Sequence, residues 1–387
     1  MEKRLEHTLK FNNQTRGGYR DSSIELFRIL VMLCIMAHHY VVNSGITDAI
    51  TTENVLSPNA VFALLFGWGG KTGINCFVLI TGYYMCKSKI SLKKYLKVHL
   101  EVIFYEFIFY SIFVLTGYEE FQLKAFLKSM LFTSYIGTEF ISSYLVFFPF
   151  IPFLNLFIKA MNERQHRYLI GICLLTGSFL QTFLNAAKSF TYVGWFMALY
   201  LIASYIRLWT DGAYENKWLS RDFFSKRKLW GFATVLMLLL SWGSVLAGAM
   251  AYAIMGKRLY YHFVADSNKL LAVGTAICAF LFFKNLQMGY SKMINKIAAS
   301  VFGVLMIHAN SDAMRRLLWG DLFDNVGAFE RGAQHMGPFI LHALGSVLAL
   351  YIICTLLDMV RIQLIEKPFF RWYDNRVKGC KKCLRLF

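Results

Sequence analysis

Long apolar runs alternate with short polar or basic segments along nearly the whole chain. A helix of about 20 apolar residues is long enough to cross the hydrocarbon layer of a membrane. The runs lie near 24–40, 59–85, 98–116, 143–161, 168–184, 191–209, 229–252, 268–286, 297–310 and 338–360. The pattern therefore predicts an all-α membrane protein with roughly ten transmembrane helices. The ninth run is the shortest, and its loss would move the C-terminal tail to the other side of the membrane.

The composition agrees with a membrane protein and excludes a soluble domain of this length. Hydrophobic residues occupy 57% of the 387 positions, and the mean hydropathy is positive. The formal net charge is +18, but the basic residues form short clusters between the apolar runs, so no nucleic-acid partner is expected. With both chain ends in the cytoplasm, about 30 of the 41 Lys and Arg residues lie on inner segments and about 9 on outer loops, as the positive-inside rule requires.

The chain divides into one membrane domain and two tails. Residues 1–22 are basic and lack a small-residue cleavage signature, so we expect a retained cytoplasmic tail. Residues 23–360 form one transmembrane domain, and Asp21-Ser22-Ser23 is expected to cap its first helix. Residues 361–387 mix aromatic and basic side chains, which predicts an amphipathic strip on the anionic lipids of the inner leaflet. A ligand-binding tail is the alternative.

The eight cysteines indicate neither a disulfide framework nor a metal site. None lies in a predicted outer loop, where disulfides would be expected. The spacing Cys380-x-x-Cys383 resembles half of a zinc site, but a structural zinc ion needs about four ligands and no second pair is present. We therefore expect no metal.

The first span carries an arginine near one end and two histidines near the other. A charge inside such a helix is costly and marks a functional candidate. Arg28 and His39 are eleven residues apart, which places them within about 20° of one face and roughly 16 Å apart along the axis. His38 lies about 80° off that face, so His39 is the geometric choice. The alternatives are an interfacial His38, a structural His39, and an Arg28 that snorkels or pairs with Glu25.

The second span is rich in glycine and contains another charge, Lys71, in the stretch 67–84. Its glycines predict either a close approach of two helices or a break, which at membrane depth is tolerated only beside protein or water. Two roles for Lys71 remain open, namely binding an anionic ligand and pairing with a buried carboxylate such as Glu101 or Glu106.

Several segments resemble acyltransferase family 3, a family of bacterial membrane enzymes. Arg28, ten intervening residues and His39 resemble its Arg-x10-His signature. The stretch 73–83 is similar to its second-span pattern, with Thr81 in place of the usual serine. Three further segments carry the resemblance along the rest of the chain. They are the basic run Lys93, Lys94 and Lys97, with lysines for arginines, the stretch from Ser300 to His308, and Glu366-Lys-Pro368.

The resemblance implies transfer of an acyl group, acetyl in the simplest case, from acetyl-CoA to a hydroxyl of a cell-surface or capsular polysaccharide or lipid-linked saccharide. His39 would act as the general base, since histidine titrates near neutral pH. The anionic donor would be held by Arg28, Lys71, Lys94 and Lys97. His308 and Asp312 would support His39 or contact the substrate, although a packing role for His308 is the alternative. The protein would lie in the bacterial cytoplasmic membrane.

Composition alone leaves other functions open. A lipid-linked glycan flippase or transporter also carries intramembrane charges, broken helices and basic inner loops. A membrane sensor would need a soluble signalling domain, and none is visible. Aromatic residues that could stack on sugar rings are also typical of membrane-interface belts. These aromatic residues are Tyr260, Tyr261, Phe263, Trp319 and Phe323.

Overall fold

The structure is a computed structural model, and it describes residues 20–88, 90–130, 140–184, 190–210 and 221–378. Most of the predicted N-terminal tail and the end of the C-terminal tail, with Cys380 and Cys383, lie outside the described residues. The described part contains helices and no strand, so the prediction of an all-α membrane protein is confirmed.

Seven helical segments of the described chain are long and apolar enough to cross a membrane, or eight if one bent pair counts as a single span. The seven are α2 (Ser22–Val42), α4 (Pro58–Phe66) with α5 (Gly70–Met85), α6 (Leu92–Leu115), α8 (Phe140–Phe147) with α9 (Ile151–Ala160), α12 (Tyr192–Tyr205) with η4 (Ile206–Thr210), α14 (Arg227–Met255), and α20 (Met336–Arg361) continued by η6 (Ile362–Glu366) and α21 (Lys367–Lys378). Two more predicted spans are helical but shorter or more polar. They are α10 (Glu163–Leu174) with η3 (Leu175–Phe179) and α11 (Leu180–Phe183), and α15 (Leu270–Lys284).

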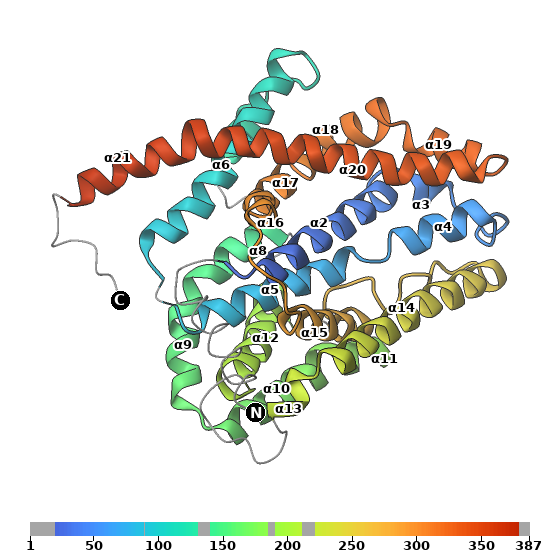
Figure 1. Cartoon of the computed structure of the whole chain (residues 1–387). Coiled ribbons are helices and arrows are strands. Elements are labelled where there is room, and N and C mark those ends of the chain that lie inside the picture. Colours follow the sequence, from blue (N-terminus) through green and yellow to red (C-terminus); the bar gives the residue numbers. More distant parts are fainter. Residues whose placement is uncertain (1–19, 89, 131–139, 185–189, 211–220, 379–387) are drawn as a thin grey trace.

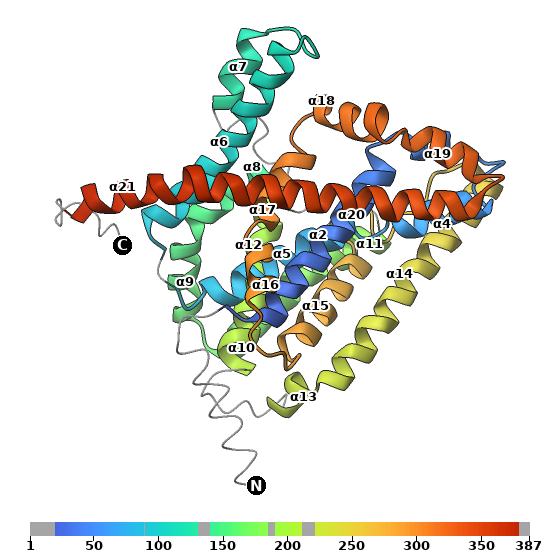
Figure 2. The ribbon, with the colours of Figure 1, turned by 45° about the horizontal axis from the view of Figure 1, so that its top comes forward.

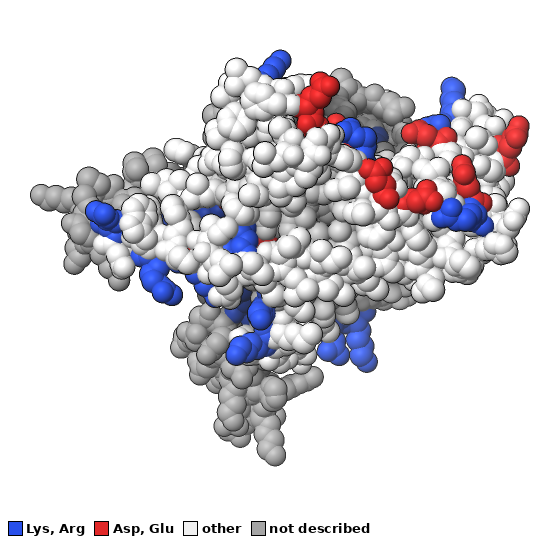
Figure 3. Space-filling view, turned by 90° about the horizontal axis from the view of Figure 1, so that it is seen from above, with Lys and Arg blue, Asp and Glu red and all other residues white. Residues whose placement is uncertain are grey.

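Helix α2 lies in the middle of the bundle, where α5, α15 and α20 pack against it (Figure 1). Its first turn is capped as predicted, because the Asp21 carboxylate accepts the backbone N–H of Ser23 at 3.0 Å. Helix α20 and the segments that follow it form one long rod that extends past the bundle, while α6 and α7 (Leu123–Met130) project as an arm (Figure 2). In the view of Figure 3, the acidic side chains gather on one part of the face and most basic side chains lie elsewhere.

The glycines of the second span produce both a break in the helix and a close approach of two helices. Helix α4 ends at Phe66 and α5 begins at Gly70, so the helix is broken between them. Beyond the break, a Cβ atom at Gly70 would overlap the His38 ring, and one at Gly73 would overlap Ile35. Glycine therefore allows α5 to lie directly on α2. His38 Nδ1 lies 2.6 Å from the Gly67 carbonyl oxygen and donates to it, so this histidine satisfies a carbonyl at the break.

The ninth predicted span, 297–310, differs from a simple helix. Helices α16 (Lys292–Ala298) and α17 (Val301–His308) form one arm, and α18 (Asp312–Arg315) with η5 (Arg316–Leu322) forms another, bent away by 96°. The bend follows from the residues between the arms, since the Ser311 hydroxyl accepts the Met314 N–H and starts a new helix. The apolar run alone gave no sign of this turn.

A buried ion network fixes the far end of α20. The Arg361 guanidinium contacts Asp358 at 2.8 Å, Glu101 of α6 at 2.9 Å and Glu366 at 3.0 Å. All four side chains are buried or nearly so. Asp358 also fills a notch on α17, where Gly303 leaves room for its carboxylate. Removing one partner of a buried pair costs about 3–5 kcal/mol, so this network joins α6, α17 and α20 firmly.

We expect Gly303→Ala to lower the stability of the protein by about 1–3 kcal/mol, because the added methyl group overlaps the Asp358 carboxylate. Thermal unfolding of the purified protein in detergent measures this. Gly243→Ala on α14 is the matched control, since its methyl group meets no atom within 4 Å and alanine favours the helix. Equal unfolding temperatures for the two variants would show that the Asp358 carboxylate does not need the space that Gly303 leaves.

Candidate active site

The fold brings together two histidines that are 269 residues apart in sequence. His39 near the end of α2 and His308 at the end of α17 have Nδ1 and Nε2 atoms 3.0 Å apart, within hydrogen-bond distance. Their ring centroids are 5.1 Å apart, and His308 is fully buried. The predicted general base and its predicted support are therefore direct neighbours.

The partners of this pair determine where the protons lie when both rings are neutral. His308 Nδ1 is 2.6 Å from the Val304 carbonyl oxygen, which can only accept, so Nδ1 carries the hydrogen. The Nε2 atom of His308 is then an acceptor, and His39 Nδ1 must donate to it. The Nε2 atom of His39 consequently keeps its lone pair. That nitrogen is the basic atom of the pair.

Part of the first span keeps accessible surface although other helices pack around it. Surrounding protein desolvates Cys34, His38 and His39. All three nevertheless keep accessible surface, and Cys34 is exposed. This accessible surface leaves room for a small ligand beside this part of α2.

Two cations act on the histidine pair from different elements. Lys71 of α5 and Arg315 of α18 both interact electrostatically with His39. Lys71 donates to the Tyr192 hydroxyl at 2.9 Å, whereas Glu101, one of its two suggested carboxylate partners, belongs to the Arg361 network. Positive charges beside a base favour the binding of an anionic group.

Arg315, which the sequence did not single out, and Asn310, two residues after His308, are further candidates for the site. Arg315 pairs with the exposed Asp312 at 2.8 Å through Nη1. The Nε atom of Arg315 and the Nδ2 atom of Asn310 are buried, and neither has a partner in the described part of the chain. Because Arg315 lies beyond the 96° bend, no spacing rule for a straight helix could have found it.

Arg28 takes one of the roles left open for it. Its Nη1 atom lies 3.1 Å from the Glu25 carboxylate, and Glu25 also lies 3.7 Å from Arg20. Arg28 is partly exposed and interacts electrostatically with the Tyr144 and Tyr351 side chains. Because α2 is one unbroken helix, Arg28 stays roughly 16 Å along the axis from His39. The two residues do not touch.

The basic run at the start of α6 lies away from the histidines and binds the C-terminal helices. Lys97 Nζ is 2.6 Å from Glu366, and Lys93 Nζ is 2.6 Å from Asp374. Lys94 donates to the Ser88 hydroxyl at 3.1 Å. This run therefore joins α6 to η6 and α21.

The aromatic residues suggested for sugar stacking contact other parts of the protein. Tyr261 donates to the Leu64 carbonyl at 3.0 Å, and Trp319 packs edge-on against Tyr40 with ring centroids 6.0 Å apart. Phe263 packs against Phe183. Within the part of the chain that the structure describes, no group of three His, Cys, Asp or Glu residues could hold a metal ion.

One comparison with known proteins identifies a family. The family model described as an acyltransferase domain, that of acyltransferase family 3, matches residues 21–359. This range includes both histidines of the pair and the bend that carries Arg315. Neither a curated protein nor a solved structure matches the chain.

We expect the neutral His39 ring to carry its hydrogen on Nδ1 and to lose this preference in His308→Phe, which keeps a ring but removes the acceptor. Nitrogen NMR of histidine-labelled protein distinguishes the two tautomers. In the control variant His166→Gln, the His39 signals should not change, because His166 bonds to the Leu201 carbonyl elsewhere in the bundle. A His39 ring that keeps the same tautomer without His308 would contradict the proton assignment.

Proposed function

We propose that this chain, which belongs to acyltransferase family 3 and is a multi-pass membrane acyltransferase, transfers an acetyl group from acetyl-CoA to a hydroxyl of a cell-surface or capsular polysaccharide. The observation that carries this proposal is the His39–His308 hydrogen bond, which leaves a free lone pair on His39 Nε2. A base within reach of a hydroxyl is what O-acylation needs. The acceptor is either the polysaccharide itself or a lipid-linked saccharide.

The reaction follows from that nitrogen. His39 Nε2 takes the proton of the acceptor hydroxyl while the hydroxyl oxygen attacks the thioester carbonyl carbon. The C–O bond forms, and the carbonyl oxygen becomes an oxyanion. When the oxyanion re-forms the carbonyl, the C–S bond breaks and the thiolate takes the proton from His39. The products are the O-acyl ester and free coenzyme A, and both histidines return to their starting state.

Three donors are suited to the oxyanion. Lys71 and Arg315 supply positive charge near His39, and Asn310 supplies an amide N–H. The buried Arg315 Nε and Asn310 Nδ2 have no partner in the described residues, and leaving such donors unpaired costs about 1–3 kcal/mol each. A carbonyl oxygen that gains charge during the reaction would satisfy them. We assign them to the oxyanion for this reason.

The donor would enter from the basic end of the bundle and extend along α2. In this proposal the N- and C-termini lie in the cytoplasm and the protein lies in the bacterial cytoplasmic membrane, in keeping with the positive-inside rule. Along such a path, Arg28 is suited to the phosphates or the pantetheine carbonyls of the donor, and Lys71, which acts on His39, is suited to its thioester carbonyl. Lys94, which donates to a hydroxyl and not to a carboxylate, is suited to a donor phosphate, whereas Lys97 would first have to leave Glu366.

We expect His39→Ala to lower the acyl transfer rate by about 10²–10⁴-fold, because the proton acceptor is removed. Transfer of labelled acetyl from acetyl-CoA to the acceptor by purified protein measures this. His38→Gln is the control, since glutamine retains a donor for the Gly67 carbonyl, and it should keep most of the rate.

Mass spectrometry of the surface glycan from cells with and without the gene tests the reaction itself. A glycan that keeps its acyl groups but fails to reach the surface would contradict acyl transfer and favour a transporter. Equal losses in the two histidine variants would contradict the assignment of the base to His39.

We expect Arg315→Gln to lower kcat by about 10²–10³-fold with little change in KM, because the lost charge acts on the transition state. Arg315→Lys should recover part of the rate. Asp312→Asn removes the ion pair but keeps the guanidinium, and it should be nearly as active as the native protein. If Asp312→Asn loses as much activity as Arg315→Gln, the arginine has a structural role instead.

A further inference from the structure

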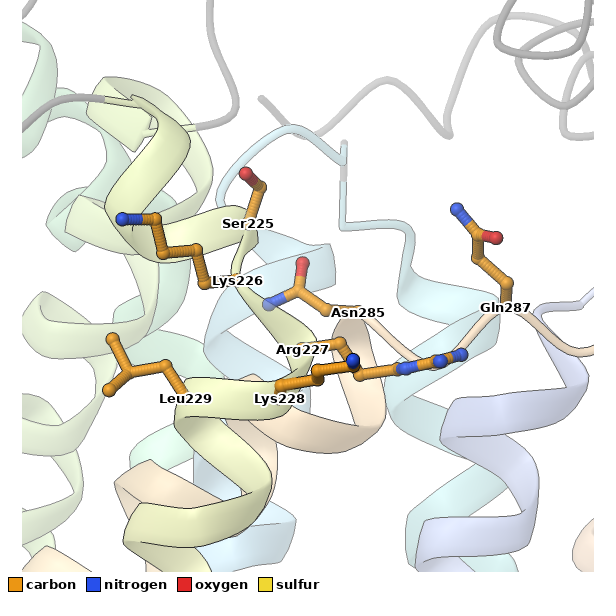
Figure 4. A pocket seen from close by; sticks show the side chains of 7 residues that line it. All are labelled: Ser225, Lys226, Arg227, Lys228, Leu229, Asn285 and Gln287. Carbon is orange, nitrogen blue, oxygen red and sulfur yellow. The ribbon is translucent and has the colours of Figure 1, made fainter. Parts of the chain in front are cut away.

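A pocket of about 480 Å³ lies at the start of α14, away from the histidine pair (Figure 4). It is lined by the consecutive residues Ser225, Lys226, Arg227, Lys228 and Leu229, and by Asn285 and Gln287 just after α15. Asn285 holds this wall in place, because its amide donates to the Phe224 carbonyl at 2.6 Å and to the Leu281 carbonyl at 2.8 Å. None of the helices that carry His39, His308 or Lys71 contributes to the lining.

The pocket is strongly cationic. Lys226, Arg227 and Lys228 are exposed, and none of them forms an ion pair with a carboxylate of the described residues. They also occupy the first turn of α14, which contains no acidic residue. The helix dipole makes this end positive as well. The three basic side chains repel one another and the positive end of the helix. A bound anion would reduce both repulsions.

The surroundings of the pocket are apolar and face outward. Only 17% of the most apolar stretch of α14 is buried in the bundle, and α14 lies at its edge (Figure 1). Leu229 lines the pocket and is 37% exposed. Further along the same side of α14, Phe232 is 69% exposed and Leu236 is 45% exposed. A ligand with a phosphate in the pocket could therefore lay hydrocarbon chains along α14.

We infer that this pocket binds the phosphate of an anionic membrane phospholipid, with its acyl chains along the exposed face of α14. Basic side chains at a membrane surface attract such lipids electrostatically. The coenzyme of the proposed reaction also carries phosphates. The continuous apolar face of α14 favours the lipid, since a nucleotide has no chains to place there.

Lipid retention by the purified full-length protein tests the inference. Native mass spectrometry after incubation with phosphatidylglycerol or phosphatidylcholine gives the bound fraction of each. We expect the native protein to prefer phosphatidylglycerol, and the triple variant Lys226→Gln, Arg227→Gln and Lys228→Gln to bind it about 10- to 100-fold more weakly. Arg227→Gln alone should cause a smaller loss in the same direction. The control replaces three exposed cations outside the pocket by glutamine, namely Arg164, Lys292 and Lys296.

Three results would overturn the inference. One is unchanged retention of phosphatidylglycerol in the pocket variants. Another is an equal loss in the control triple variant, which would show a general effect of surface charge. The third is a loss of coenzyme A binding in the pocket variants while lipid retention persists. The assay contains no acyl donor and can be repeated in His39→Ala, so its outcome is independent of the proposed function.

Discussion

The requirement that polar groups in an apolar bundle find protein partners governs this structure. Arg361 meets it with three carboxylates and Arg28 meets it with Glu25. Most buried polar atoms in proteins are likewise paired, because an unpaired one costs free energy. Arg315 Nε and Asn310 Nδ2 have no partner in the described chain, and Arg315 acts electrostatically on the histidine pair. Unpaired donors beside a base are suited to a reacting ligand, which would complete their hydrogen bonds.

Two interrupted helices place these groups. The break before Gly70 positions Lys71 in the first turn of α5, and Arg315, which lies beyond the bend after His308, acts electrostatically on His39. Irregular backbone at membrane depth is tolerated only where protein or water satisfies it. His38 does so at the first interruption, through the Gly67 carbonyl. Both interruptions therefore contribute to the site. Lys71 follows the first interruption, Arg315 follows the second, and a continuous helix would have directed each cation away from His39.

Local patterns in the sequence predicted the parts of the site that lie on one element. The spacing of Arg28 and His39, the cap at Asp21 and the break among the glycines all depend on neighbours in the chain, and the structure contains each of them. The partner of Lys71 proved to be a tyrosine hydroxyl from α12, and the position of Arg315 depends on a 96° bend. Such contacts arise from packing between distant segments. One sequence carries no direct signal for them.

The choice of a second histidine as the support for His39 has an electrostatic consequence. A carboxylate in that place would be an ionised group near Lys71 and Arg315, and it would pair with them. The cations would then be less available to an oxyanion. Neutral His308 fixes the same tautomer of His39 through its bond to the Val304 carbonyl, and it adds no negative charge. A neutral support therefore orients the base and still leaves the positive charges to the substrate.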